Sequence, residues 1–327
     1  MGNQLPGDPL CPGLGKLVIR ESAPAKIILF GEHAVVHGQP AIALPFPALR
    51  AHVSISESPM ELEFRSVDGS LLAAPHLPKK SDPLLLQMLL TVLRRLRIAA
   101  PEISVLLYSE IPQACGFGSG AAIATALTRA LARHAGRPIS AAEVNDIVFE
   151  TESIFHGTPS GIDNTIIVHE RALCFTRGTD PLPVQIDQSF QLLVADSGDR
   201  CATHIPVSAV RERLQLHPEG TAVILEDIGA IVNKALRVLA SGQPPALGAL
   251  MYKNHALLGK LGVSSPLLDR LVSAAGSAGA AGAKLSGAGR GGVVIALVKE
   301  SGSADVALAL QDAGAVQIWN ATIQATN

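Results

Sequence analysis

The 327-residue sequence is short of aromatic side chains and of charge. Aromatic residues make up 3% of the chain and charged residues 17%, and 26 Lys and Arg nearly balance 28 Asp and Glu. The resulting net charge of −2, without a long basic run, argues against a general nucleic-acid-binding protein and against a protein held at a membrane surface. No apolar run approaches roughly 18 residues, so we expect no transmembrane helix.

Cysteine is also scarce, and the four residues, Cys11, Cys115, Cys174 and Cys201, are scattered along the chain. They form no CxxC pair and have no histidine at zinc-finger spacing, so we expect neither structural zinc nor a disulfide framework. Isolated thiols in a chain of this length fit a reducing compartment, which predicts a cytoplasmic location. The first sixteen residues lack a basic segment followed by an apolar core, so no signal peptide is expected.

What the sequence does contain is 48% hydrophobic residues and 30 glycines, over a length that suits about two domains. Strand-like and helix-like segments follow one another without the regular alternation of a doubly wound sheet, which predicts an α+β fold in two lobes. A polar, proline-containing stretch at 178–189 marks the expected boundary. The predicted lobes are therefore residues 1–185 and residues 186–327.

Periodicity and capping signals predict the individual elements. An apolar strand containing Lys26 is expected within the segment 22–38, and short strands are expected on either side of Arg171. The other predicted strands are 16–22, 48–56, 60–66, 103–111, 190–196, 291–298 and 316–323. The predicted helices are 83–98, 119–135, 140–155, 204–215, 222–240, 246–261, 266–275 and 304–312.

Two segments place charge where catalysis could use it. In residues 22–38 (SAPAKIILFGEHAVVHG), Lys26 either points at solvent or delivers a cation into a cleft, where it would stabilise an anion. In residues 150–164 (ETESIFHGTPSGIDN), a helix carrying Glu152 precedes a Pro/Gly-rich loop that presents Asp163. These carboxylates could hold magnesium or orient a hydroxyl group, and an ordinary turn in which Asp163 accepts backbone hydrogen bonds is the alternative.

Two glycine-rich segments could bring their backbone close to a ligand. Residues 111–122 (IPQACGFGSGAA) turn from a strand into a helix, where free N–H groups favour phosphate, although such a turn is often only a turn. Residues 283–296 (AKLSGAGRGGVVIA) match GxGxxG, but an apolar strand follows the glycines where dinucleotide binding needs a helix. A loop closing over a ligand and a plain hairpin both remain open. No GxxxxGK[ST] sequence occurs, so no Walker loop is expected.

The joint order of these segments resembles the GHMP kinases, most closely their mevalonate kinase branch. HGTPSGIDN (156–164) is similar to the signature HGxPSGxDN, the segment 22–38 to the opening APGKxILxGEHAVVxG, and AKLSGAGRGG (283–292) to the closing KLTGAGGGG loop. The resemblance extends from about residue 22 to residue 298. It implies a two-lobed fold with the active site in the cleft between the lobes. The implied reaction transfers the γ-phosphoryl group of Mg-ATP to the 5-hydroxyl of mevalonate, in isoprenoid biosynthesis.

The resemblance also implies roles for residues that match the family motifs. Asp163 would be the catalytic carboxylate, as a base or as an electrostatic orienter. Lys26 would stabilise the developing alkoxide and the transferring phosphoryl group, and Glu152 would bind magnesium. The residues implied to surround the nucleotide are Gly116, Phe117, Gly118, Ser119, Gly120, Gly287 and Gly289.

On the acceptor side, the resemblance implies that His33 and Glu32 lie near mevalonate. Ser197 and Thr203 belong to a segment, DSGDRCAT, that is similar to DTGxxxxT, and are further candidates for groups lining the substrate cleft. Mevalonate is thus the expected small-molecule partner, with no nucleic acid and no membrane. Similar kinases are usually dimers, so a homodimer is possible on this resemblance.

The sequence departs from the mevalonate kinase pattern in both glycine loops. The first loop reads PQACGFGSGAA in place of PxGxGLGSSAA, so Phe117 replaces a leucine, and Gly120 stands where a serine is expected to bind magnesium. Ser119 and a water molecule are the two candidate replacements for that ligand. Arg290 interrupts the last glycine run, as a phosphate-binding cation, a selector of another acceptor, or a solvent-facing side chain.

These departures keep two alternatives open. One is a sister kinase acting on phosphomevalonate or on the 3-hydroxyl of mevalonate, and the other is a non-catalytic metabolite sensor of the same fold. Retention of Lys26, Glu152 and Asp163 together argues against the sensor. Cys115 in the first loop is expected to favour the thiolate, since amides at a helix N-terminus stabilise negative charge.

Overall fold

The structure is a computed structural model in which two compact units alternate along the chain. It describes residues 19–57, 62–66, 68–99, 102–156 and 159–326, except the side chains of 155 and 156. The beginnings of two expected strands, at 16–18 and 60–61, lie outside the described residues. The first unit comprises the described residues within 1–24, 49–111 and 120–159, and the second those within 25–48, 112–119 and 160–327. The expected lobe boundary at residue 185 stays a prediction.

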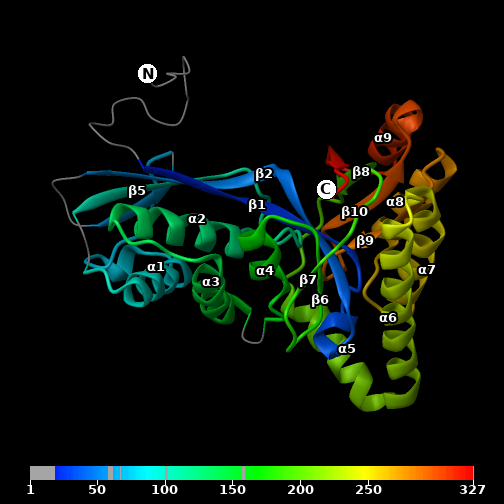
Figure 1. Cartoon of the computed structure of the whole chain (residues 1–327), viewed down its shortest axis with the longest axis horizontal. Coiled ribbons are helices and arrows are strands. Elements are labelled where there is room, and N and C mark those ends of the chain that lie inside the picture. Colours follow the sequence, from blue (N-terminus) through cyan, green and yellow to red (C-terminus); the bar gives the residue numbers. More distant parts are fainter. Residues whose placement is uncertain (1–18, 58–61, 67, 100–101, 157–158, 327) are drawn as a thin grey trace. The chain divides into compact units, whose positions relative to one another are not determined.

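The first unit is a sheet with helices on one side (Figure 1). Its strands run in the order β4–β3–β5–β2, with β2 antiparallel to β5 and β3 parallel to β5. Strands β1 and β2 both continue into the second unit. The elements are β1 (Ile19–Phe30), β2 (Ala41–Glu57), β3 (Glu63–Ser66), β4 (Leu71–Ala73), α1 (Pro83–Leu96), β5 (Ile103–Ser109), α2 (Ser119–His134) and α3 (Ala141–His156), with short 3-10 turns at Ala34–His37 and Pro78–Lys80.

The second unit contains an antiparallel sheet of order β11–β8–β10–β9. Helix α7 packs on β9, and helix α8 packs on β9 and β10 (Figure 1). The elements are α4 (Ile162–His169), β6 (Leu173–Phe175), β7 (Leu182–Pro183), β8 (Phe190–Asp196), α5 (His204–Leu216), α6 (Pro218–Ala240), α7 (Leu247–Lys260), α8 (Pro266–Ser277), β9 (Gly282–Ser286), β10 (Val293–Val298), α9 (Ser303–Asp312) and β11 (Gln317–Ile323), with 3-10 turns at Pro244–Ala246 and Glu300–Gly302.

Close packing of α7 on β9 brings the last glycine segment into a fixed place. Gly248 in α7 faces Gly282 in β9, and a Cβ on Gly248 would overlap the Ala281 carbonyl. Only glycine permits this approach of a helix to a strand. Every residue of β9 and β10 is buried, so the turn between them starts and ends on rigid strands.

The α+β prediction is confirmed, and most predicted elements are present. The expected strand before Arg171 is wrong: residues Ile162–His169 form helix α4. Strand β9 was not predicted. Ser140 Oγ accepts a hydrogen bond from Glu143 N (3.2 Å), which caps the start of α3. No helix within the described residues is long and apolar enough to span a membrane.

Candidate active site

Lys26 and Asp163, the two expected catalytic residues, form an ion pair within the second unit. Lys26 Nζ lies 2.9 Å from Asp163 Oδ1. Lys26 is 2% exposed, because its neighbours in β1 are apolar and buried, and its backbone N–H donates to the Phe117 carbonyl (2.9 Å). The lysine therefore does not point at solvent. Its charge meets an aspartate whose side chain is 28% exposed and so remains accessible to a ligand.

Asp163 lies in the first turn of α4, and the expected Pro/Gly-rich loop ends before it. Gly161, directly before the helix, has a φ of 90°, a conformation that residues with a Cβ rarely adopt. Ser160 Oγ accepts a hydrogen bond from Ile162 N (3.3 Å), and Thr165 Oγ1 donates to the Gly161 carbonyl (2.6 Å). These local bonds fix the start of the helix and so the position of Asp163.

The first glycine loop, residues 113–118, lies directly against this ion pair. A Cβ on Gly118 would lie 3.3 Å from Lys26 Cγ and 3.4 Å from Asp163 Oδ2. It would also lie 2.8 Å from Ile167 Cδ1, closer than side chains pack. Gly118 has a φ of 75°, so both its conformation and the close approach need glycine. The loop backbone thus stands within reach of both charged groups.

Phe117 anchors the same loop through its side chain. Its ring stacks on Phe46 with centroids 5.6 Å apart and meets Trp319 edge-on at 5.6 Å. Phe46 also meets Trp319 edge-on, at 6.4 Å. Aromatic pairs at these separations are favourable beyond the area they bury. Phe117, at the position of the family's leucine, therefore completes an aromatic cluster beside the Lys26–Asp163 ion pair.

The last glycine loop, residues 287–292, connects β9 and β10. These strands pair antiparallel, with Ser286 opposite Val293, so the hairpin interpretation of this segment is confirmed. A Cβ on Gly287 would lie 3.3 Å from Gly116 Cα, which means that the two glycine loops touch backbone to backbone. Closure of this loop over a ligand stays a prediction.

Arg290 turns back on its own unit. Its Nε donates to the Gly262 carbonyl (3.2 Å), and its backbone N–H donates to the Val263 carbonyl (2.7 Å). Its side chain is exposed, and its φ is 56°. Arg290 is therefore held by its backbone, while its guanidinium bonds to the turn that follows α7. This geometry fits the solvent-facing alternative, and the phosphate-binding and acceptor-selecting roles stay predictions.

Glu32 forms an ion pair that the sequence analysis did not foresee. Its Oε1 binds Lys284 Nζ, and both side chains are completely buried. Lys284 also donates to the Leu285 carbonyl (2.6 Å). Glu32 Oε2 is buried and accepts no hydrogen bond within the described part of the chain. The signal was present: Lys284 is the lysine of the AKLSGAGRGG motif, the one cation in an otherwise small and apolar strand.

Burial acts on both partners of this pair. It raises the pKa of Glu32, which the charge of Lys284 opposes, and it lowers the pKa of Lys284, which Glu32 opposes in turn. Lys26 also favours the charged form of Glu32. Each charge is therefore maintained by its partner, since neither would be stable alone in this environment.

His33 is held in a strained backbone conformation next to Glu32. Its φ is 61°, which is uncommon for a residue with a side chain and is found at functional sites. Its Nε2 lies 2.8 Å from the Ala288 carbonyl of the last glycine loop. Burial lowers the pKa of His33 to about 4, although the bond to Ala288 opposes this. At neutral pH the ring is uncharged, donates through Nε2, and leaves Nδ1 as an acceptor.

Ser197 and Thr203 occupy different environments. Ser197 is buried, and its backbone N–H donates to the Gly292 carbonyl (2.9 Å), so the structure brings it to the last glycine loop. Thr203 is half-buried directly before α5 and makes no side-chain cap to that helix. The geometry supports Ser197 as a neighbour of the site more directly than Thr203.

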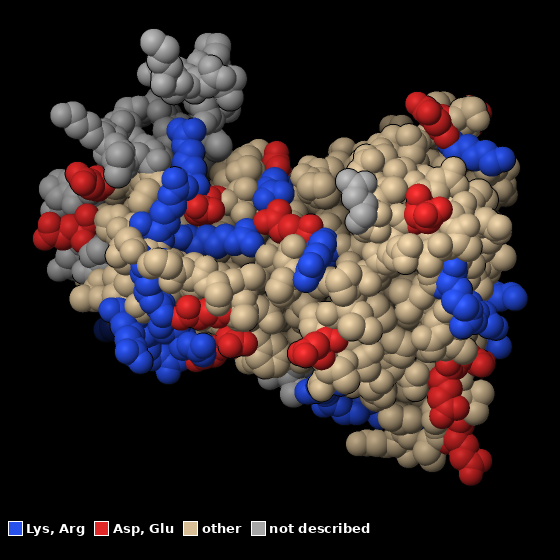
Figure 2. Space-filling view, in the orientation of Figure 1, with Lys and Arg blue, Asp and Glu red and all other residues tan. Residues whose placement is uncertain are grey.

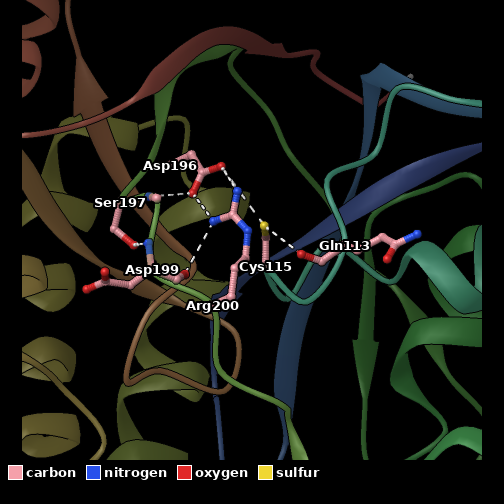
Figure 3. Close-up of polar contacts among 7 residues, drawn as sticks. Gln113, Cys115, Asp196, Ser197, Asp199 and Arg200 are labelled. Carbon is pink, nitrogen blue, oxygen red and sulfur yellow. Dashed lines mark hydrogen bonds and ion pairs between the residues drawn. The ribbon is translucent and has the colours of Figure 1, made fainter.

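Asp196, Arg200 and Cys115 form a second polar group that sequence reasoning missed (Figure 3). Cys115 Sγ lies 3.2 Å from the Gln113 carbonyl and 4.0 Å from Asp196 Oδ2. Burial, and then the Asp196 carboxylate, raise the pKa of Cys115 to about 11, against a smaller opposing effect of Arg200. The expected thiolate is therefore wrong, because burial and the Asp196 carboxylate both favour the protonated thiol.

Glu152 and Gly120 belong to the first unit and lie side by side there. Glu152 is buried in α3, and a Cβ on Gly120 would lie 2.9 Å from Glu152 Oε1. The carboxylate thus occupies space that a serine side chain would need. Ser119, the first residue of α2, is half-buried and belongs to the second unit.

The residues present fit a magnesium ion brought by a nucleotide. No group of three His, Cys, Asp or Glu side chains gathers as a metal site within the described residues. Mg²⁺ commonly takes one or two carboxylates, several waters and the phosphates of its nucleotide, so such a group is not required. The buried carboxylate of Glu152 is a suitable oxygen donor. We therefore keep it as the candidate metal ligand.

Charge on the surface is mixed. Figure 2 shows Lys and Arg interspersed with Asp and Glu on the face in view, with wide areas that carry neither. No field of a single sign covers that face. Recognition of a polyanion there would depend on a few placed cations and on backbone amides.

Comparison with known proteins identifies the class. Residues 83–170 match the GHMP kinases N terminal domain, and residues 233–316 match the GHMP kinases C terminal domain. A curated protein of Pyrococcus horikoshii is 35% identical over 315 residues, which cover 90% of this chain and 92% of that protein. The chain therefore belongs to the GHMP kinase family, and use of ATP follows from membership of a kinase family.

Its relatives within that family are mevalonate kinases. This is the name of the Pyrococcus horikoshii protein and of an Aeropyrum pernix protein that is 35% identical over 290 residues, covering 86% of this chain and 89% of that protein. The crystal structure of L. major mevalonate kinase in complex with R-mevalonate matches with a TM-score of 0.82 at 27% identity. That match covers 97% of this chain and 99% of the other.

Proposed function

We propose that this chain is an ATP-dependent mevalonate kinase, a phosphotransferase that carries the γ-phosphoryl group of ATP to the 5-hydroxyl of mevalonate in the mevalonate pathway of isoprenoid biosynthesis. The observation that carries the proposal is the ion pair of Lys26 with Asp163 against the first glycine loop. The relatives named mevalonate kinase support the same acceptor. They do not favour the sister-kinase or sensor alternatives.

Asp163 and Lys26 would act on the acceptor hydroxyl. Asp163 accepts its proton, or orients it, through a carboxylate that stays accessible in the first turn of α4. Lys26 stabilises the alkoxide oxygen as it forms and the phosphoryl group as it transfers. Phosphoryl transfer needs little covalent chemistry from the protein, so position and charge neutralisation provide most of the rate enhancement.

The two glycine loops would bind the phosphates through backbone amides. Their contact at Gly116 and Gly287 brings residues of both loops together, among them Phe117, Gly118 and Gly289. Glu152 and Ser119 are the proposed magnesium ligands, with Gly120 leaving room for the Glu152 carboxylate. When bound with the nucleotide, the ion would neutralise charge on the phosphates.

The acceptor would be recognised by Glu32 and His33. Glu32 Oε2 is a buried acceptor without a hydrogen bond from the described residues, and it suits a hydroxyl donor of the substrate. His33 is neutral and presents Nδ1 as an acceptor. Ser197, and less directly Thr203, would line the same region.

Location and assembly are part of the proposal. A cytoplasmic location is supported by Cys115, Cys174 and Cys201, which are free thiols. A homodimer is proposed on the resemblance alone. Size-exclusion chromatography with light scattering would distinguish a dimer from a monomer.

The proposed reaction is tested by the range of acceptors. ADP release is measured with ATP and mevalonate, phosphomevalonate, homoserine or galactose, and phosphorus NMR identifies the phosphorylated oxygen of the product. We expect turnover with mevalonate and a 5-phosphate product. Turnover restricted to phosphomevalonate, a 3-phosphate product, or ADP binding without turnover of any acceptor would each contradict the proposal.

A further inference from the structure

Three segments of the second unit meet at Asp196, the last residue of β8 (Figure 3). Its carboxylate is almost completely buried and accepts two hydrogen bonds from Arg200, Nη1 to Oδ1 and Nη2 to Oδ2, at 2.8 Å each. Oδ1 also accepts from Gly198 N (2.9 Å). The paired geometry makes this the strongest form of arginine–carboxylate contact.

The first glycine loop reaches Asp196 through Cys115. The thiol lies 4.0 Å from Asp196 Oδ2 and 3.2 Å from the Gln113 carbonyl of its own loop. Because the thiol stays protonated, it is a donor that can bond to either oxygen. The position of the Asp196 carboxylate therefore influences the position of Cys115, and with it the start of the first glycine loop.

The last glycine loop is enclosed between the same two segments. Ser197 N donates to the Gly292 carbonyl (2.9 Å), and Gly292 N donates to the Asp199 carbonyl (3.0 Å). On its other side, a Cβ on Gly292 would lie 2.8 Å from the Cys115 carbonyl. The two glycine loops are therefore held at a spacing that the segment 196–200 determines.

We propose that Arg200 is a positioning residue for nucleotide binding, which acts by holding Asp196 and thereby the two glycine loops at a fixed spacing. The inference rests on the proposed function, since it takes these loops to bind the phosphates of ATP. Amide donors contribute to binding in proportion to how well they are already placed. Without the guanidinium, the Asp196 carboxylate keeps, among the described residues, only the donors Gly198 N and Cys115 Sγ. The buried carboxylate would then move towards water, and Cys115 would lose its contact with it.

The chain carries its own reporter of this loop. Trp319 is the single tryptophan of the sequence, and its ring packs edge-on against Phe117 at 5.6 Å. It belongs to β11, where it pairs with Val194 of β8, two residues before Asp196. Tryptophan fluorescence of the full chain therefore reports the first glycine loop and the end of β8, without contribution from any other site.

The experiment compares Arg200→Gln, Arg200→Lys and Arg65→Gln with the unsubstituted chain. Arg65 is the matched control, because its side chain is 37% exposed and pairs with Glu63, as Arg200 is 39% exposed and pairs with Asp196. Three quantities are measured: the KM values for ATP and mevalonate, the dissociation constant of ADP from Trp319 fluorescence, and the rate of Cys115 alkylation followed by peptide mass spectrometry.

We expect Arg200→Gln to raise the KM for ATP and the ADP dissociation constant by about tenfold, equivalent to ~1.4 kcal/mol, with little change in the KM for mevalonate. Cys115 should react faster. Arg200→Lys should recover part of the affinity, since a single charge replaces the paired contact. Arg65→Gln should behave as the unsubstituted chain.

Unchanged ADP affinity and unchanged Cys115 reactivity in Arg200→Gln would overturn the proposal, and so would an equal rise of both KM values. If Arg200→Gln does not fold, the same comparison in Arg200→Lys carries the test. An unsubstituted chain that binds ADP but does not phosphorylate mevalonate would contradict the proposed function alone. The ADP and alkylation measurements would still decide the role of Arg200.

Discussion

Lys284 and Glu32 form an ion pair in which both side chains are completely buried, although 252 positions separate them in the sequence. The pair joins β9 to the turn that follows β1. Each charge depends on the other, because burial disfavours both. A buried ion pair is weak as a source of stability but costly to break. The cost of breaking this pair, and the smaller cost of removing both charges, can be measured.

Replacing Lys284 by Met should therefore destabilise the protein by about 3–5 kcal/mol, the usual cost of leaving one buried charge without its partner. The double variant with Glu32→Gln should recover most of this loss, because it contains neither charge. Urea unfolding of the unsubstituted chain and of both variants at constant pH measures both effects. A double variant that is no more stable than Lys284→Met would contradict this account.

The stability of Lys284→Met should depend on pH in a defined direction. Without Lys284, burial is the largest effect left on Glu32 and raises its pKa above the ordinary value of 4.5, against the smaller opposing effect of Lys26. A group whose folded pKa is raised contributes stability below its unfolded pKa and loses it as pH rises. The deficit of Lys284→Met relative to the unsubstituted chain should therefore shrink from pH 8 to pH 5.

Asp163→Asn and Lys26→Met should each lower turnover on the order of 10² or more, the usual effect of removing a preorganised charge from a transition state. Lys260→Met, at the exposed end of α7, is the control and should keep the full rate. Turnover is measured from ADP release. The free energy of unfolding is measured as well, because each variant leaves one charge of the pair without its partner and could lower stability. A folded variant with a near-normal rate would refute the assignment.

Gly118→Ala tests the close approach of the first glycine loop. Its added Cβ would lie 2.8 Å from Ile167 Cδ1, and the loop would have to move away from Lys26. Gly136→Ala is the matched control: its φ of 61° is also positive, but a Cβ there meets nothing within 4 Å. Both variants pay the left-handed penalty of roughly 1–2 kcal/mol. Only Gly118→Ala should lose activity.

A second substitution separates the steric contact from other causes. Ile167→Val removes the Cδ1 atom that the new methyl group would meet. In the Gly118→Ala background it should restore part of the activity, at the usual cost of about 0.5–1.5 kcal/mol for this change in a core. If the double variant is as inactive as Gly118→Ala, contact with Ile167 is not the reason for glycine at this position.

Gly120→Ser would introduce the residue expected from the family pattern, yet it should impair the enzyme. Its Cβ would lie 2.9 Å from Glu152 Oε1, so the carboxylate would have to turn away from its present position. We expect a higher magnesium concentration for half-maximal activity and weaker binding of Mn²⁺ in the presence of ADP, measured by electron paramagnetic resonance. Gly259→Ser, on α7 with nothing within 4 Å of the new Cβ, should change neither quantity. Tighter metal binding by Gly120→Ser would contradict this prediction.

Burial of His33 should make the free energy of unfolding depend on pH. Its pKa falls from 6.5 to about 4 on folding, because the ring is buried. A lowered pKa contributes stability above the unfolded value, which is lost as pH falls towards the folded one. The contribution should decrease by about 2 kcal/mol between pH 7.5 and pH 5. Urea unfolding of the unsubstituted chain and of His33→Asn isolates this slope. Equal slopes would show that His33 titrates normally.

Most of the helices, and the order of the motifs, could be predicted from the sequence. Helices such as α1 and α6 follow from apolar spacing, since one buried stripe on a 3.6-residue period is visible in a short window. Strand β8 was predicted with its bounds, because a short, continuously apolar segment between polar ones fits a buried strand. The motifs that contain Lys26, Asp163 and the two glycine loops were enough to predict the GHMP kinase family.

The contacts of those residues depend on the three-dimensional fold. Helix α4 carries β-branched residues that favour a strand, and only the left-handed Gly161 and burial of the helix explain its form. Strand β9 consists largely of small residues without alternation, so only its pairing with β10 shows that it is a strand. Local propensity contains no information about either.

The same limit applies to the site. Lys284 meets Glu32, and Arg200 holds Asp196 beside Cys115, through sheet pairing and burial that bring distant segments together. The shifted pKa values of Glu32, His33 and Cys115 arise from that burial. A sequence specifies which charges exist, whereas the surrounding dielectric and partners, which only the fold supplies, determine what those charges do.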